Sequence, residues 1–130
     1  MTKLLTALMA SAGLALAGVA SGADTMTRDQ YKAEKDKIEA SYKAAKERCD
    51  GLSGNPKDIC KAEAKGSYNV TKAELDARNK NTPEARRDVA VKKAEATYDV
   101  AKEKCDDLAG NAKDVCVKDA KAARERAKAA

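Results

Sequence analysis

Residues 42–65, YKAAKERCDGLSGNPKDICKAEAK, decide the fold, because they return 56 residues later as residues 98–121, YDVAKEKCDDLAGNAKDVCVKDAK. The two copies share a tyrosine, two cysteines and a Gly-Asn corner at equivalent places. A unit of about 50 residues that is used twice accounts for most of the chain. The sequence therefore predicts one duplicated module.

Each copy is typical of two helices around a tight corner. Gly54 and Gly110 stand where a helix can end through the left-handed conformation. Asn55 and Asn111 follow directly and are good helix caps, with Pro56 suited to the first turn of the next helix. Apolar residues and alanines before the corner recur with heptad spacing, which predicts coiled-coil-like packing.

The outer helix boundaries come from capping signals. Thr27 and Gln30 have the spacing of a capping box, and Thr82 followed by Pro83 marks a second start. We expect helices over residues 28–52, 56–78, 83–109 and 112–128. The domain organisation is then a first hairpin module at 24–78, a linker at 79–82 and a second hairpin module at 83–130.

The fold class is all-α, with two tandem helical hairpins. The sequence does not decide how the two hairpins pack against each other. They can form a four-helix bundle or remain an elongated pair. The second helix is expected to be the weakest, because Gly66, Asn69 and Thr71 have low helix propensity.

The four cysteines form two copies of C-x10-C, Cys49 with Cys60 and Cys105 with Cys116. Antiparallel helices that leave a tight corner would place the two thiols of each pair opposite each other. Pairing within a module is favoured, although four cysteines allow three connectivities. The spacing is unlike that of zinc sites or thiol oxidoreductases, so we expect structural disulfides.

The amino terminus has the layout of a secretory signal peptide. Lys3 precedes an uncharged apolar run over residues 4–20, and Ser21 and Ala23 provide small residues for cleavage. We expect residues 1–23 to be removed, the mature chain to be periplasmic, and no membrane span to remain in it. The alternative is an uncleaved anchor, for which the run is short.

Composition argues against catalysis. The chain has no His, Trp or Phe, 26 Lys and Arg against 21 Asp and Glu, and a formal charge of +5. Without histidine there is no Ser–His–Asp or Cys–His arrangement, and the carboxylates are interleaved with Lys and Arg on helix faces. We expect no enzymatic activity, no catalytic or metal-binding residues and no cofactor.

Basic residues give the alternative function. Two clusters, at the start of the third helix and in the carboxy-terminal tail, are candidates for contact with anionic polymers such as envelope polymers or nucleic acid. These residues are Arg86, Arg87, Lys121, Arg124, Arg126 and Lys128. Tyr42 and Tyr98, which are equivalent in the repeat, are expected to pack inside their hairpins with the hydroxyl at the edge.

The doubled CDxLxGNxKDxC corner, behind a signal peptide and within helices rich in Ala, Lys and Glu, resembles small exported proteins of Gram-negative bacteria, some of them labelled as cell-envelope or TolA-like. The resemblance implies a periplasmic location. TolA proteins have a retained anchor, a long Ala/Lys-rich helix and a folded carboxy-terminal domain. This chain resembles only the middle element, and no residue role is carried over.

Three hypotheses about function remain. The first is a non-catalytic structural or interaction protein of the periplasm or cell envelope. It would bind an unknown protein partner or a second copy of itself. The second is a weak electrostatic binder of anionic polymers. The third is a thiol redox or metal-binding protein, which requires free and reactive thiols.

Overall fold

The computed structural model describes residues 25–130 as four helices: α1 (Arg28–Asp50), α2 (Gly54–Lys80), α3 (Pro83–Cys105) and α4 (Gly110–Ala129). The all-α fold and the two helical hairpins, α1–α2 and α3–α4, are confirmed. The expected signal peptide over residues 1–23 and its cleavage site after Ala23 lie outside the described residues.

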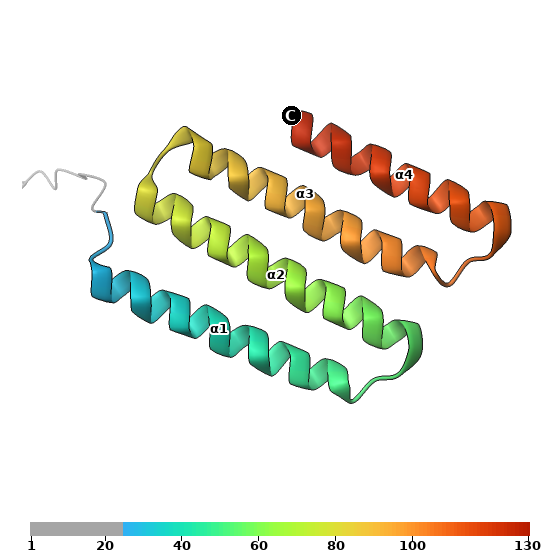
Figure 1. Cartoon of the computed structure of the whole chain (residues 1–130), viewed down its shortest axis with the longest axis horizontal. Helices are drawn as coiled ribbons and strands as arrows, with labels where there is room; N and C mark the ends of the chain where they lie inside the picture. Colours follow the sequence, from blue (N-terminus) through green and yellow to red (C-terminus); the bar gives the residue numbers. More distant parts are fainter. Residues whose placement is uncertain (1–24) are drawn as a thin grey trace, which may run out of the picture.

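The four helices lie side by side in one antiparallel row (Figure 1). Among these helices, α1 contacts α2, α2 contacts α3 and α3 contacts α4, and no other pair touches. The molecule is therefore neither a four-helix bundle nor two separate hairpins. Within residues 25–130 no helix covers either broad face of the row, and α1 and α4 each have a neighbouring helix on one side only.

The predicted starts of α1 and α3 are confirmed. The Thr27 side chain accepts a hydrogen bond from the backbone N–H of Gln30, whose side chain accepts one from the Thr27 N–H, completing the capping box. Thr82 caps α3 by accepting from the N–H of Ala85. These side chains satisfy backbone donors that the first helical turn leaves without partners.

The corners differ from the prediction in detail. Gly54 and Gly110 do adopt left-handed conformations, with φ of +62° and +57°, but they begin α2 and α4 instead of ending the helices before them. The N-cap residues are Ser53 and Ala109, which make no side-chain cap bond. The prediction that Asn55 and Asn111 cap these helices is therefore wrong.

The ends of α1 and α3 come earlier than expected, at Asp50 and Cys105. The N–H of Leu52 bonds to the carbonyl of Cys49, and in the second copy the N–H of Leu108 bonds to that of Cys105. Each of these hydrogen bonds joins residues three apart, so the turn is tighter than that of an α-helix. The tight turn ends each helix close to its cysteine.

The second helix, which low propensity predicts to be the weakest, is α2, and it is the longest of the four at 27 residues. It has neighbours on both sides, α1 and α3, and tertiary packing outweighs intrinsic propensity. It runs to Lys80 and ends at Asn81, whose φ is +50°, so only two residues separate it from α3.

The buried interior is small and consists of thin seams between neighbouring helices. Among residues 25–130, Leu75 is the largest fully buried side chain at 1% exposure, and the only others are Cys49 and Cys105. Gly66 is buried where α2 meets α3, and an added Cβ there would lie 2.8 Å from the Cβ of Ala96. The α4 helix has no buried residue. A single row built largely from alanine leaves little apolar area to hide.

Disulfides close both corners within their own modules, as the spacing predicts. Cys49 pairs with Cys60 and Cys105 with Cys116, with Cα separations of 5.5 and 5.7 Å. The alternative pairing between modules is excluded.

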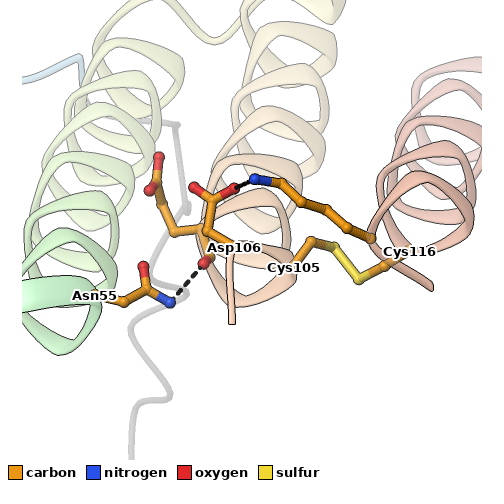
Figure 2. Close-up of a disulfide and its surroundings, with 6 residues drawn as sticks. Asn55, Cys105, Asp106 and Cys116 are labelled. Carbon is orange, nitrogen blue, oxygen red and sulfur yellow. Dashed lines mark hydrogen bonds and ion pairs between the residues drawn. A yellow bond between two sulfur atoms is a disulfide. The ribbon is translucent and has the colours of Figure 1, made fainter. Parts of the chain in front are cut away.

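An ion pair accompanies each disulfide. Lys57 lies 3.6 Å from Asp50 in the first corner, and Lys113 lies 2.8 Å from Asp106 in the second (Figure 2). The hydrogen bond to Asp106 raises the pKa of Lys113 above its ordinary value. Both corners are therefore built from the same two cross-links.

The open end of the first hairpin is fastened by a polar contact. The Tyr31 hydroxyl on α1 donates a hydrogen bond to a carboxylate oxygen of Asp76 on α2. This bond, with burial and the negative charge of Asp76, raises the pKa of Tyr31 above its ordinary value. The first hairpin is thus held at both ends, by this bond and by its disulfide.

We expect Tyr31→Phe to lower the stability of the folded chain near neutral pH by about 1 kcal/mol, the usual net contribution of such a bond. Because the folded-state pKa of Tyr31 is raised, its contribution is complete below the unfolded value of about 10 and is lost as pH rises through the folded value. The melting temperatures of the wild type and of Tyr31→Phe, measured between pH 7 and 11, should converge as the pH becomes alkaline. A difference that stays constant across that range would contradict this account.

Candidate interaction surface

A groove runs between α1 and α2 on one face of the row, and we call it hairpin groove 1. Its volume is about 290 Å3, and its walls include Ser41, Tyr42, Ala45 and Tyr68. The rings of Tyr42 and Tyr68 stack with centroids 4.5 Å apart. Small residues keep the floor shallow, while the aromatic pair provides a rigid apolar wall.

A second groove, hairpin groove 2, lies between α3 and α4 and has a volume of about 350 Å3. Its lining is equivalent in the repeat to that of hairpin groove 1, with Thr97 at the place of Ser41 and Tyr98 at the place of Tyr42. Arg124 occupies the position that Tyr68 has in the first module, and its guanidinium lies 4.2 Å from the Tyr98 ring centroid. A cation–π contact thus replaces the aromatic stack.

A central groove of about 420 Å3 lies between α2 and α3 and connects hairpin groove 1 with hairpin groove 2. It shares Ser67 with hairpin groove 1, and Thr97 and Ala101 with hairpin groove 2. The three grooves therefore open on the same side of the row. We call this side the furrowed face.

The opposite side of the row has a different chemistry. A hollow between α2 and α3 on that side is lined by Lys61, Lys65 and Asp99 together with other charged residues. Lys61 and Lys65 also line a hollow between α1 and α2. The row therefore has one face lined mainly by small, hydroxyl and aromatic residues, with Lys37, Arg48 and Lys93 among them, and one face that is mainly charged.

The tyrosines pack in their hairpins as expected, with partners that the sequence did not reveal. Tyr68 and Arg124 were missed because they differ in type, although they stand at equivalent repeat positions. Lysines also lie over the stacked rings, with Lys46 Nζ 4.6 Å from the Tyr42 centroid and Lys72 Nζ 5.0 Å from that of Tyr68. Aligning the second helix of one module with that of the other, at the 56-residue offset, would have paired Tyr68 with Arg124.

The six candidate anion-contact residues are brought together only in part. Ala90 and Ala127 line the same groove, so Arg86 and Arg87 lie about one helical turn beyond the carboxy-terminal end of α4. Arg126 and Lys128 flank Ala127 at that end, and Lys121 lies nearly two turns away along α4.

Three of these six basic residues have intramolecular partners. Arg86 donates to the side chain of Asn81, Arg124 pairs with Glu125, and Lys128 lies 3.7 Å from Glu95. Arg87, Lys121 and Arg126 are exposed and form no ion pair with any residue from 25 to 130.

The predicted cysteine residues serve as cross-links, since all four are paired. In the part of the chain from residue 25 onward, no three His, Cys, Asp or Glu side chains are grouped in a way that could hold a metal ion. None of the helices in that part has both the length and the apolar character needed to cross a bilayer. The two disulfides are compatible with an exported protein.

Comparison of the chain with protein-family models, with curated proteins and with solved structures finds no match.

Proposed function

We propose that this chain is a non-catalytic interaction protein of the bacterial periplasm, and that its furrowed face receives a segment of another protein. The observation that carries the proposal is the pair of repeat-equivalent hairpin grooves, joined into one surface by the central groove. Such a surface fits an elongated polypeptide partner, because the two hairpin grooves each offer a tyrosine and small residues at equivalent places.

The single-row architecture supports this proposal. In a four-helix bundle, side chains from the facing helices would fill the grooves between neighbouring helices. Here no second layer of helices covers the described row, so its grooves stay accessible. The disulfides hold both corners, so the grooves are formed before a partner arrives. Preorganisation of this kind lowers the entropy that binding must overcome.

The periplasmic location rests on the signal-peptide pattern and on the two disulfides, which persist in oxidising compartments. Intact mass after alkylation without reduction tests it on protein from the periplasm. A chain that begins at Asp24 and carries no alkylated thiol is expected. A retained amino-terminal segment or four alkylated cysteines would contradict the location or the cross-links.

Site-specific photo-crosslinking tests the furrowed face. A benzophenone amino acid at Thr97, which lines two grooves, is expected to give adducts with a foreign protein in the periplasm. The matched control is Asp99, which is exposed on the same helix but faces the charged side. Equal adducts at both positions, or adducts that contain only this chain, would contradict the proposal.

A second candidate function, weak binding of anionic polymers, is favoured by one observation. The antiparallel pairing of α3 and α4 places Arg86 and Arg87 at the same end of the row as Arg126 and Lys128, about one helical turn beyond the end of α4. Such a cluster attracts polyanions by electrostatics, with an affinity that falls steeply as salt rises. Thiol chemistry is not proposed, because all four cysteines are paired.

We expect the double variant Arg87→Gln/Arg126→Gln to weaken binding to heparin or single-stranded nucleic acid. The slope of log affinity against log salt should become shallower by about two, roughly one for each charge removed. Lys35→Gln/Lys43→Gln on α1 is the matched control with the same change in net charge. If both double variants change the slope equally, the effect is one of net charge, and this site is wrong.

A further inference from the structure

The contact between α2 and α3 is the junction at which the first module meets the second. The close approach of Gly66 to Ala96 marks its centre. Near the corner, the Asn55 side chain donates a 2.9 Å hydrogen bond to the backbone carbonyl of Glu103 (Figure 2). The junction thus uses one strip of residues on α2 and a complementary strip on α3.

Both strips recur at the free edges of the row. Adding 56 to the α2 positions gives residues on α4, and subtracting 56 from the α3 positions gives residues on α1. The strip on α4, which we call the α4 edge, consists of Asn111, Val115, Ala122 and Ala129, equivalent to Asn55, Ile59, Gly66 and Ala73. The strip on α1, the α1 edge, consists of Ala33, Ala40, Ala44 and Glu47, equivalent to Val89, Ala96, Val100 and Glu103.

Burial changes at every one of these positions. All eight junction residues on α2 and α3 are buried or half-buried, whereas all eight residues of the α4 edge and the α1 edge are exposed. Val115 is 48% exposed, one of the most exposed large apolar side chains among the described residues. The two edges are therefore the separated halves of a contact that the chain already makes once within itself.

We infer that copies of this chain associate edge to edge, with the α4 edge of one copy packed on the α1 edge of the next. The register is that of the α2–α3 junction, which places Ala122 against Ala40 and brings the Asn111 side chain to the carbonyl of Glu47. The antiparallel order of helices then continues from one copy into the next. This inference concerns the edges and does not depend on the furrowed face.

Flanking charges support this register. Glu63 and Lys104 line the central groove from opposite sides of the junction, and their equivalents are Asp119 and Arg48. On the charged face, Asp58 and Lys102 line the same hollow, and their equivalents are Asp114 and Lys46. Each edge thus keeps the sign of charge that the internal junction has, so opposite charges meet again in the contact between copies.

Several differences make the contact between copies weaker than the internal one. Ala33 and Ala44 are smaller than their equivalents Val89 and Val100, so less apolar area is buried. Ala122 stands where the junction has Gly66, so the helices cannot approach as closely. Lys43 stands where the junction has Asp99, and it faces Lys121 instead of pairing with it. The association therefore depends on concentration, and it can be strengthened by restoring the glycine.

The two edges are different surfaces, so the contact is heterologous and does not end at a dimer. It continues into open chains, or into rings where the rotation closes. Stacked repeat proteins use neighbour contacts of the same kind within one chain.

Sedimentation velocity of the oxidised, exported protein tests the inference. Ala122→Gly is expected to shift the onset of association to about tenfold lower concentration than in the wild type. Ala122→Arg blocks the α4 edge and Ala40→Arg blocks the α1 edge, so each variant alone should be monomeric. Mixing the two should give a dimer and nothing larger, because one intact α4 edge meets one intact α1 edge.

The control is Asp88→Arg, a substitution at an exposed position on α3 that belongs to neither edge and lines none of the three grooves, and it should associate like the wild type. Circular dichroism and melting confirm that each variant is folded. A monomeric Ala122→Gly protein at millimolar concentration, a mixture that stays monomeric, or association of either blocked variant alone would each overturn the inference.

Discussion

Replacing Cys105 and Cys116 by serine is expected to release α4 from the row while α1–α3 stay folded. The disulfide closes a short loop, and the chain-entropy account gives it about 3 kcal/mol. The α4 helix has no buried residue, and beyond the corner it is held to α3 by the packing of small residues such as Ala94 and Ala120, by the Arg124–Tyr98 contact and by the Lys128–Glu95 pair. Exposed contacts of this kind contribute little when the cross-link is lost.

Hydrogen exchange with mass spectrometry is the measurement for this prediction. Amides of residues 110–129 should exchange on the order of 100-fold faster, which corresponds to about 3 kcal/mol. The matched control is Cys49→Ser/Cys60→Ser, where Ile38, the Tyr42–Tyr68 stack and the Tyr31–Asp76 bond still hold α1. The account is wrong if α4 keeps its protection, or if all four helices lose theirs together.

Gly66→Val is expected to destabilise the whole row by about 3 kcal/mol, the upper end of the range for overpacking a tight interface. An added Cβ would lie 2.8 Å from the Cβ and 3.3 Å from the Cα of Ala96, and backbone cannot move aside as a flexible side chain can. The helices must therefore separate, and this junction is the contact that joins the two modules. For a chain of this length the melting temperature should fall by roughly 10–20 °C.

Two further variants give this prediction its controls. Gly66→Ala should be less damaging than valine, because alanine recovers about 1 kcal/mol of helix propensity, and adding Ala96→Gly should restore part of the loss. Gly51→Ala is the matched glycine substitution in an open place, with φ of −73° and only an ordinary 3.6 Å contact to the Arg48 carbonyl, and it should be neutral. Thermal unfolding followed by circular dichroism is sufficient. Equal melting temperatures for Gly66→Val and the wild type would refute the close-approach argument.

Local chemistry explains why much of the fold could be predicted. Thr27 and Thr82 cap helices through bonds that span three residues, and the two cysteines of each module face each other across a short corner. Such features depend on neighbours in the chain, so the pattern of residues is enough. Asn55 shows where prediction from local sequence fails, because its side chain donates a hydrogen bond to α3 instead of capping its own helix.

The grooves and their partners could not be predicted in the same way. The exposed charge of Arg87 and Arg126 followed from composition, but the place of Arg124 over the Tyr98 ring depends on which helices lie next to each other. The furrowed face exists only because three seams open on one side of the row. No spacing within a single helix encodes that arrangement.

The sequence by itself determined the repeat, the four helices and the places of the two corners, and it favoured disulfide pairing within each module, since each of these features rests on contacts within one module. Only the tertiary structure decided that the helices form a single row, and that Gly66 joins the modules at a distance no larger residue allows. The reason is physical: helix propensity and capping are set by residues a turn or two apart. Helix order is instead set by which small surfaces fit closely across the whole chain.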